Sequence, residues 1–418
     1  MRLQNQAKNA LLAVSFLIGA FLFSFFSVSA QAPVAPDAPP PDGSLNGKQW
    51  FENFQIRGYA QMRYNRLGET NPDLRCEQCD QSWGRDGGFF LRRARIIFFG
   101  QIHPRVYFYI QPDFASRAGN SGNYGQLRDL YFDIGLDDDN EFRFRLGQSK
   151  VPFGFENLQS SQNRLALDRN DAINSAFSNE RDIGVFFYWA PLKVREMYRR
   201  LVAEGYKGSG DYGAVGFGVF NGQTANRAER NDALHVVGRL TYPFEIGNQI
   251  IEPSLQAYTG EFVLAPWQIS EGVKTEGEDF AFKDERIAGS LIWYPRPFGI
   301  QVEYNVGRGP EFNPANNTIE TKPLHGGYVL LNARTTIQGK QLLYPFARYH
   351  YYQGGKKHEQ DARSYEVSEL EIGFEWLPVP NFELVVMYTV SSRRFEDYQL
   401  PANRQEGSLI RIQAQMNF

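Results

Sequence analysis

Arginine is the residue type whose number and spacing in this chain point most directly to chemistry. Only 11 of the 44 basic residues are lysine, and the rest are arginine. A guanidinium stays charged in every environment and offers oxyanions a planar fork of donors. Arginines that alternate with apolar residues in extended segments share one face. That face is predicted to carry Arg57, Arg63, Arg93, Arg95, Arg143, Arg145, Arg239, Arg334, Arg348 and Arg411. Rings of such side chains give an aqueous pore a preference for anions.

Carboxylates fall on the same face and leave a second interpretation open. They are Asp129, Asp133, Glu303, Glu369, Glu371 and Glu375. If they neutralise the arginines, the wall carries mixed charge, and a pore would be non-selective or would prefer cations. The formal net charge of -3 shows no basic excess that would call for nucleic acid.

One long connection, residues 149–180, has enough residues to fold inward and narrow such a pore. It contains Lys150, Arg164 and Arg169, and Arg181 follows directly. An ordinary surface loop is the alternative. Because a barrel of about sixteen strands leaves an aqueous channel unless a loop narrows it, we expect an inward constriction here.

The two cysteines, Cys76 and Cys79, are spaced C-x-x-C in a polar stretch. A zinc site normally needs four ligands, and the second pair is missing. Redox chemistry of the thioredoxin type needs a strand–helix–strand context, which this segment lacks. In an exported chain a small disulfide that staples the loop is the expected outcome.

Nothing in the sequence indicates catalysis. Of the five histidines, His103 lies at a turn, and His235 and His350 lie on the polar faces of extended segments. No serine stands in a nucleophile motif. We therefore expect neither an enzyme nor a cofactor.

The elements that carry these residues show a period of two. In the last segment Ile410, Ile412, Ala414, Met416 and Phe418 alternate with polar residues, and in the first Phe54, Ile56, Gly58, Ala60 and Met62 do the same. Alternation of this kind separates the two faces of a strand. Large apolar and aromatic outward groups favour hydrocarbon outside and water inside, so the pattern predicts a transmembrane antiparallel β-barrel.

Turns alternate in length between these segments. Short turns fall at His103-Pro104, Asp137–Asn140, Phe244–Asn248, Pro295–Pro297, Gln338–Lys340 and Pro378–Pro380. Long connections fall at residues 66–87, 115–123, 149–180, 221–231, 262–281, 309–324, 354–362 and 393–407. Counting between them gives about sixteen strands. Residues 190–210 stay ambiguous, either a long turn or an extra strand. Closure is expected because lipid satisfies no backbone hydrogen bonds.

The N-terminus has the features of an export signal. Basic residues precede an apolar run at 11–27, and Val28-Ser29-Ala30 ends in a small-x-small cleavage pattern. We expect a cleaved signal peptide over residues 1–30, with an uncleaved anchor as the alternative. A Pro-rich linker would follow over 31–49, and the barrel over 50–418.

Several motifs resemble the phosphate-selective porins of the O/P type over roughly residues 50–418. Phe90–Arg95 (FLRRAR) is similar to that family's arginine-rich strand, and Leu146–Gly154 (LGQSKVPFG) to the entry of its constriction loop. Arg181–Val185 (RDIGV) and Val219–Gly222 (VFNG) are similar to two further segments. The final Phe418 is similar to the terminal aromatic that the outer-membrane assembly machinery recognises.

The resemblance implies a homotrimer of sixteen-stranded barrels in the lipid of the bacterial outer membrane. It also implies an arginine ladder that leads anions such as phosphate or polyphosphate to a lysine-rich throat. Arg92, Arg93, Arg95 and Lys150 match its motifs by position. One departure is that Lys150 is the only lysine of residues 149–180, which weakens the case for phosphate specificity.

Residues and resemblance together predict a porin for passive diffusion of small hydrophilic solutes, with a preference for inorganic anions. The alternatives are a non-selective or cation-preferring porin and a non-conducting structural or adhesin barrel.

Overall fold

The structure, a computed structural model, describes residues 53–67, 87–116, 123–276 and 278–418. The expected signal peptide (1–30), the linker (31–49) and the Cys76–Cys79 pair lie outside these residues. The described strands begin at Phe54.

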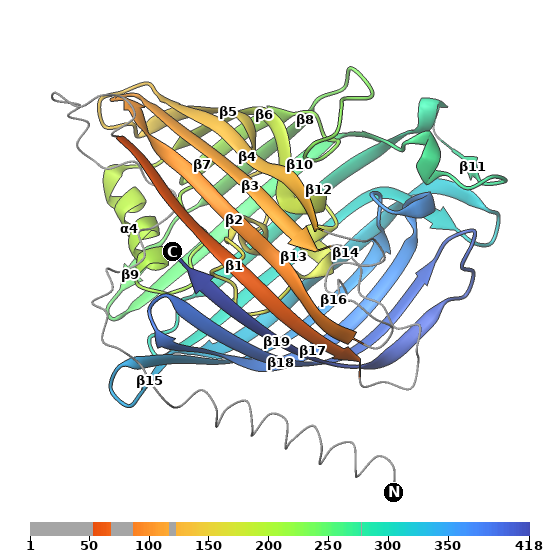
Figure 1. Cartoon of the computed structure of the whole chain (residues 1–418). Helices are drawn as coiled ribbons and strands as arrows, with labels where there is room; N and C mark the ends of the chain where they lie inside the picture. The colour runs from red at the N-terminus through yellow and green to blue at the C-terminus, as the bar shows by residue number, and fades with distance from the viewer. Residues whose placement is uncertain (1–52, 68–86, 117–122, 277) are drawn as a thin grey trace, which may run out of the picture. The chain divides into compact units, whose positions relative to one another are not determined.

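Sixteen long antiparallel strands form one closed barrel (Figure 1), as the turn pattern predicts. They are β1 (Phe54–Leu67), β2 (Gly87–His103), β3 (Val106–Ser116), β4 (Asn123–Gly135), β5 (Phe142–Lys150), β6 (Arg181–Trp189), β7 (Val215–Phe220), β8 (His235–Thr241), β10 (Gln249–Val263), β12 (Ala281–Trp293), β13 (Phe298–Asn313), β14 (Thr318–Ala333), β16 (Gln341–Gly355), β17 (Ser364–Val379), β18 (Phe382–Glu396) and β19 (Arg404–Asn417). Three short strands, β9 (Phe244–Ile246), β11 (Lys274–Thr275) and β15 (Thr335–Ile337), lie in the connections.

The barrel closes where the last strand meets the first. β1 pairs with β2 on one side and β19 on the other. The backbone N–H of Gly58 donates to the carbonyl of Phe418 (2.7 Å), and the N–H of Phe418 donates back (2.9 Å). A Cβ at position 58 would lie 2.4 Å from the carbonyl oxygen of Arg95 and 2.5 Å from the Phe418 ring. Only glycine therefore fits this seam.

The two faces of the strands differ as the period-two pattern predicts. On β1 Ile56 and Met62 are exposed outward, whereas Tyr59 and Arg63 are buried inward. The same alternation holds along β5 and β17. The outer face is therefore apolar and the inner face polar, which suits a wall between lipid and water.

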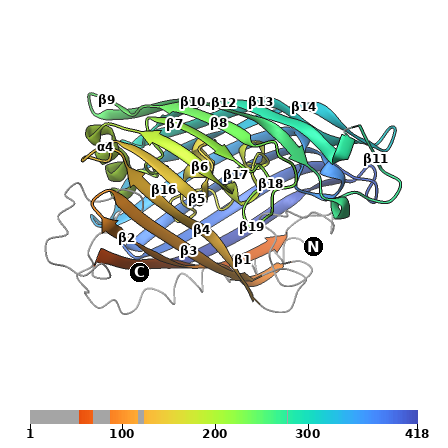
Figure 2. The same cartoon turned by 90° about the horizontal axis from the view of Figure 1, so that it is seen from above.

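The two ends of the barrel differ in their connections (Figures 1 and 2). Helix α4, β9 and β15 lie at the end with the short turns, and β11 lies at the opposite end. One expectation was wrong: residues 309–324 are mostly strand, because β13 runs to Asn313 and β14 begins at Thr318. A long two-stranded hairpin replaces the expected loop.

Residues 190–210 contain a helix, α4 (Leu192–Ala203), so the extra strand weighed for this segment is wrong. Val194, Tyr198 and Leu201 are buried at spacings of four and three residues. This is a helical period, which a search for alternation misses. The even strand count is thereby preserved.

Candidate functional site

Residues 151–180, called the lumenal loop from here on, leave β5 at the long-connection end and fold into the barrel. They include two helical turns, α2 (Phe155–Leu158) and α3 (Asp171–Asn174), and a 3-10 turn, η2 (Ser178–Glu180). Nearly all their side chains are buried. The expected inward fold is confirmed, although Ser149 and Lys150 complete β5 rather than begin the loop.

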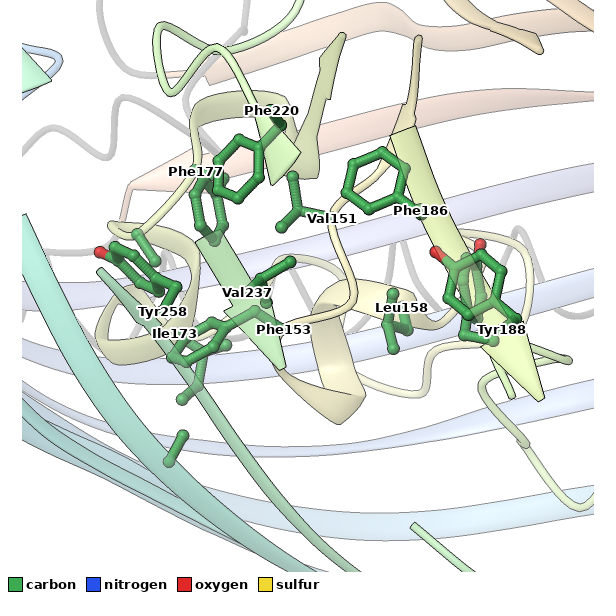
Figure 3. Packing of buried hydrophobic residues seen from close by; sticks show 13 residues of the cluster. Val151, Phe153, Leu158, Ile173, Phe177, Phe186, Tyr188, Phe220, Val237 and Tyr258 are labelled. Carbon is green, nitrogen blue, oxygen red and sulfur yellow. The ribbon is translucent and has the colours of Figure 1, made fainter. Parts of the chain in front are cut away.

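Apolar side chains attach the lumenal loop to two parts of the wall. Phe153 and Phe177 contact the ring of Tyr258, with centroids 5.0 and 4.8 Å apart (Figure 3). Elsewhere Leu165 and Leu167 join a cluster with wall residues of β14, β16 and β18. Burying a phenylalanine contributes roughly 1.5–3 kcal/mol, so these contacts fix the loop in the lumen.

Carboxylates and guanidiniums orient the same loop. The carboxylate of Glu303 on β13 accepts from the backbone N–H groups of Phe155 (2.6 Å) and Glu156 (3.2 Å). Glu156 in turn pairs with Arg348 on β16 and accepts from the backbone N–H of Asn170 (2.7 Å). The start of α2 is thereby tied to β13 and β16, and Glu156 holds Asn170 beside it.

Asp168 joins the loop to another part of the wall. Its carboxylate lies 2.8 Å from Arg63, 2.8 Å from Arg411 and 3.2 Å from Arg92. Burial acts to raise the pKa of Asp168, but the three guanidiniums hold that pKa well below its ordinary value. Asp168 is therefore ionised throughout the physiological range.

A β-bulge brings Arg92 into this contact. The pairing of β1 with β2 shifts register at Gln61, and Arg92 is the extra residue on β2. A bulge interrupts alternation, so Arg92 and Arg93 both lie on the lumenal side. The resemblance assigned Arg92 by position, whereas the period of two alone placed only Arg93 inward.

A second bulge, between β3 and β4, does the same for Arg128. The register shifts after Gln111, and Arg128 is the extra residue on β4. Arg128 and Asp129 are consequently both buried, and Arg128 lies 3.2 Å from Glu180. Arg128 was missed because strict alternation assigns it to the outer face. The one feature of the sequence that points to Arg128 as a lumenal residue is its position next to Asp129.

A cavity of about 320 Å³ lies between the lumenal loop and the strands that carry the two bulges. Its basic lining residues are Arg92, Arg93, Arg95, Arg128, Arg164, Arg169 and Lys356, and its carboxylates are Asp113, Asp168, Glu180 and Glu359. Seven cations face four anions, a formal excess of three positive charges. We call this space the basic cavity.

Two arginines of the basic cavity have no carboxylate partner among the described residues. Arg93 donates to the side-chain oxygen of Gln61 (3.1 Å), and Arg164 donates to the carbonyl of Leu167 (3.3 Å). The Nε and Nη1 atoms of Arg164 are buried without a hydrogen-bond partner. Burial lowers the pKa of Arg164, yet a guanidinium keeps its proton at neutral pH. Both charges are therefore available to an anion.

Most other predicted site arginines form ion pairs. The pairs are Arg95–Asp113 (2.9 Å), Arg143–Asp211 (2.8 Å), Arg145–Asp133 (2.7 Å), Arg169–Glu180 (2.7 Å) and Arg181–Asp129 (2.8 Å). Arg57 lies over the ring of Phe99, 5.0 Å from its centroid, and Lys150 donates to the carbonyl of Leu158 (2.6 Å). The wall thus carries mixed charge both inside the basic cavity, at Arg95 and Arg169, and beyond it, and the role of these residues in permeation stays a prediction.

Two lysines reach the lumen from a connection whose orientation the sequence does not predict. Lys356 lies 2.7 Å from Asp171 of the lumenal loop, and Lys357 pairs with Asp284. Both belong to the connection between β16 and β17, within the predicted loop 354–362. Alternation gives no orientation for a loop, so the only sequence signal is the Lys356–Lys357 pair itself.

Within the described ranges no helix is both long and apolar enough to cross a membrane. A family model described as phosphate-selective porin O and P matches residues 68–418. A search of curated proteins finds no match.

Solved structures share the fold. The outer membrane channel DcaP of Acinetobacter baumannii has 12% sequence identity and a TM-score of 0.54, covering 87% of this chain and 97% of that one. Salmonella typhi OmpF in complex with daunomycin also has 12% identity, with a TM-score of 0.52, covering 88% of this chain and 98% of that one.

Proposed function

The chain belongs to the phosphate-selective porin O and P family, and from this premise we propose that it passes small hydrophilic solutes by diffusion with a preference for anions such as phosphate or polyphosphate. As a member of that family it is an outer-membrane porin, a channel rather than an enzyme. No cofactor is needed, because solutes move down their own gradients.

The observation that carries the anion preference is the excess of positive charge in the basic cavity. Arg93 and Arg164 supply two guanidiniums that have no carboxylate at ion-pair distance in the described part of the chain, and the cavity is walled by buried protein groups. Field focusing in a narrow space with low-dielectric walls raises the local concentration of the opposite charge. A planar guanidinium also matches the geometry of an oxyanion.

Ion pairing along the lumen, inside the basic cavity at Arg95 and beyond it, supports weak rather than tight binding. Arg95, Arg145 and Arg181 each have a carboxylate within 3 Å, so they add little net field. Permeation needs sites that an ion can leave. The same pairing favours the second candidate function, a porin with little charge preference.

We also propose that the chain is exported with cleavage after Ala30 and assembles as a homotrimer. The first proposal rests on the sequence of the N-terminus and the second on the family resemblance.

The test is the zero-current potential of the purified protein in a planar bilayer across a KCl gradient, repeated with potassium phosphate. The proposal expects a sign that corresponds to anion preference in both salts. A potential near zero would favour the non-selective porin, a potential of opposite sign a cation-preferring porin, and an absence of conductance the non-conducting barrel.

A further inference from the structure

Two cations stand on the outer face of the barrel, near the end with the long connections. Lys283 follows the start of β12 and Arg308 precedes the end of β13, with side chains 41% and 54% exposed. They share a face with Ile287 and Val306, which are exposed to the membrane side. That end faces the cell exterior in outer-membrane barrels.

The strand register places these cations directly beyond the apolar band. Ile287 pairs with Val306, and one row further out Glu285 pairs with Arg308. Rows on one face are two residues apart, which is about 6.6 Å along a strand. The outer face therefore changes from apolar to charged within one row, at the level where lipid headgroups begin.

The arrangement holds both cations in place around one carboxylate and leaves one positive charge in excess. Arg308 Nε lies 2.7 Å from Glu285 Oε1, and Lys283 Nζ lies 3.7 Å from Glu285 Oε2. One carboxylate thus serves two cations. Among the described residues Arg308 has a partner only at Nε, so its two terminal nitrogens can donate to another oxyanion in a bidentate manner.

A cleft of about 380 Å³ opens between these side chains and the β13–β14 hairpin. Its walls include Lys283, Arg308 and Lys322 and the carboxylate of Glu276, and Glu285 lies beside the first two of these cations. Pro323, opposite Arg308 in the register, adds an apolar surface. Three cations around a partly apolar cleft suit an anionic headgroup attached to hydrocarbon chains.

We propose that this cleft binds a phosphate group of an outer-leaflet lipid, with Lys283, Arg308 and Lys322 as its ligands. The lipid is favoured over free phosphate because the cations border the hydrocarbon-facing band, where acyl chains of the same molecule pack on Ile287 and Val306. The site lies on the opposite side of the wall from the basic cavity, so it does not rest on the solute preference.

The test measures lipid binding to the detergent-solubilised full-length protein by native mass spectrometry, with bisphosphorylated lipid A as the probe. The variant is Lys283→Gln/Arg308→Gln. Each cation at a membrane surface contributes about a fivefold preference for anionic lipid. The association constant is therefore expected to fall by about 25-fold.

The matched control is Arg394→Gln/Arg404→Gln, which removes two outward arginines of the β18–β19 hairpin, both already beside carboxylates. It is expected to bind the probe as the unaltered protein does. Equal binding by both variants, or an equal loss in both, would overturn the proposed site.

A second measurement needs no variant. Lipid A stripped of its phosphates is expected to bind the unaltered protein at least tenfold more weakly, and a large excess of inorganic phosphate is expected not to displace the bisphosphorylated probe. Equal affinity for the stripped lipid, or displacement by inorganic phosphate, contradicts a lipid-phosphate site. Conductance of the Lys283→Gln/Arg308→Gln variant is expected to be unchanged, which separates this result from that of the pore.

Discussion

Replacing both Arg93 and Arg164 with glutamine is expected to lower the ratio of anion to cation permeability about sevenfold at 0.1 M salt. These two guanidiniums line the basic cavity and have no carboxylate partner among the described residues. Their loss therefore reduces the net field without leaving a buried carboxylate unpaired. Glutamine removes the charge and keeps a polar amide donor on a shorter side chain.

The magnitude follows from the size of the cavity. A volume of 320 Å³ corresponds to a sphere of about 4 Å radius, which puts a wall guanidinium about 7 Å from a central ion. One unit charge at that distance in water contributes about 0.6 kcal/mol, and a Debye length of about 10 Å at 0.1 M salt leaves about half. Anion and cation are affected in opposite senses, so the ratio changes about 2.7-fold per arginine.

The assay is the zero-current potential in a planar bilayer across a KCl gradient. The matched control is Arg105→Gln, which removes the same charge from an exposed short turn where Arg105 pairs with Asp138. The two single variants are expected to show about half the logarithmic change of the double variant. A double variant whose ratio stays within twofold of the control refutes the assigned role of these arginines.

Three further outcomes are expected. Glu303→Gln replaces the charged acceptor of two lumenal-loop N–H groups by a neutral one, which weakens the attachment of the lumenal loop to β13 by about 1–3 kcal/mol. Single-channel recordings should then show more current noise and larger open levels. An unchanged trace would contradict the role of Glu303 in holding the lumenal loop. Asp168→Asn lowers the thermal unfolding midpoint at pH 7, because the arginine contacts depress the native pKa of Asp168 and its ionised form stabilises the fold. The difference in midpoint from the unaltered protein shrinks only below about pH 4, the ordinary carboxyl pKa, and is lost as pH falls from there toward the native pKa. A difference that vanishes already at pH 6 contradicts the arginine contacts. Gly58→Val puts side-chain atoms against the carbonyl of Arg95 and the Phe418 ring, so the yield of heat-resistant folded barrel should drop severalfold, whereas Ala60→Val on the same outer face should not change it.

The barrel itself could be predicted from the sequence because its physical cause is local. A strand between lipid and water must alternate, and Ile410 to Phe418 does so without interruption. Short and long turns then give the number of strands. Helix α4 escaped because its buried positions recur at a helical spacing within a segment too short to stand out from a turn.

The candidate site was less accessible to sequence reasoning. Alternation located Arg93 and Arg95, but it placed Arg128 on the wrong face, because a bulge depends on how two strands pair. Contacts between distant segments, such as Asp168 with Arg63 and Arg411, follow from how the loop folds rather than from any spacing. Whether an arginine is neutralised is therefore a tertiary property.

Solute passage through the basic cavity can be measured with a thiol in its wall. Ser178 lines the cavity and is half-buried, and Ser178→Cys in a background with Cys76→Ser and Cys79→Ser gives the chain a single cysteine. Modification by a sulfonate-bearing methanethiosulfonate during recording should reduce the open-channel current, and faster than modification by the ammonium-bearing reagent of similar size. A current that neither reagent changes, or a faster reaction with the cationic one, would contradict an anion path through this cavity.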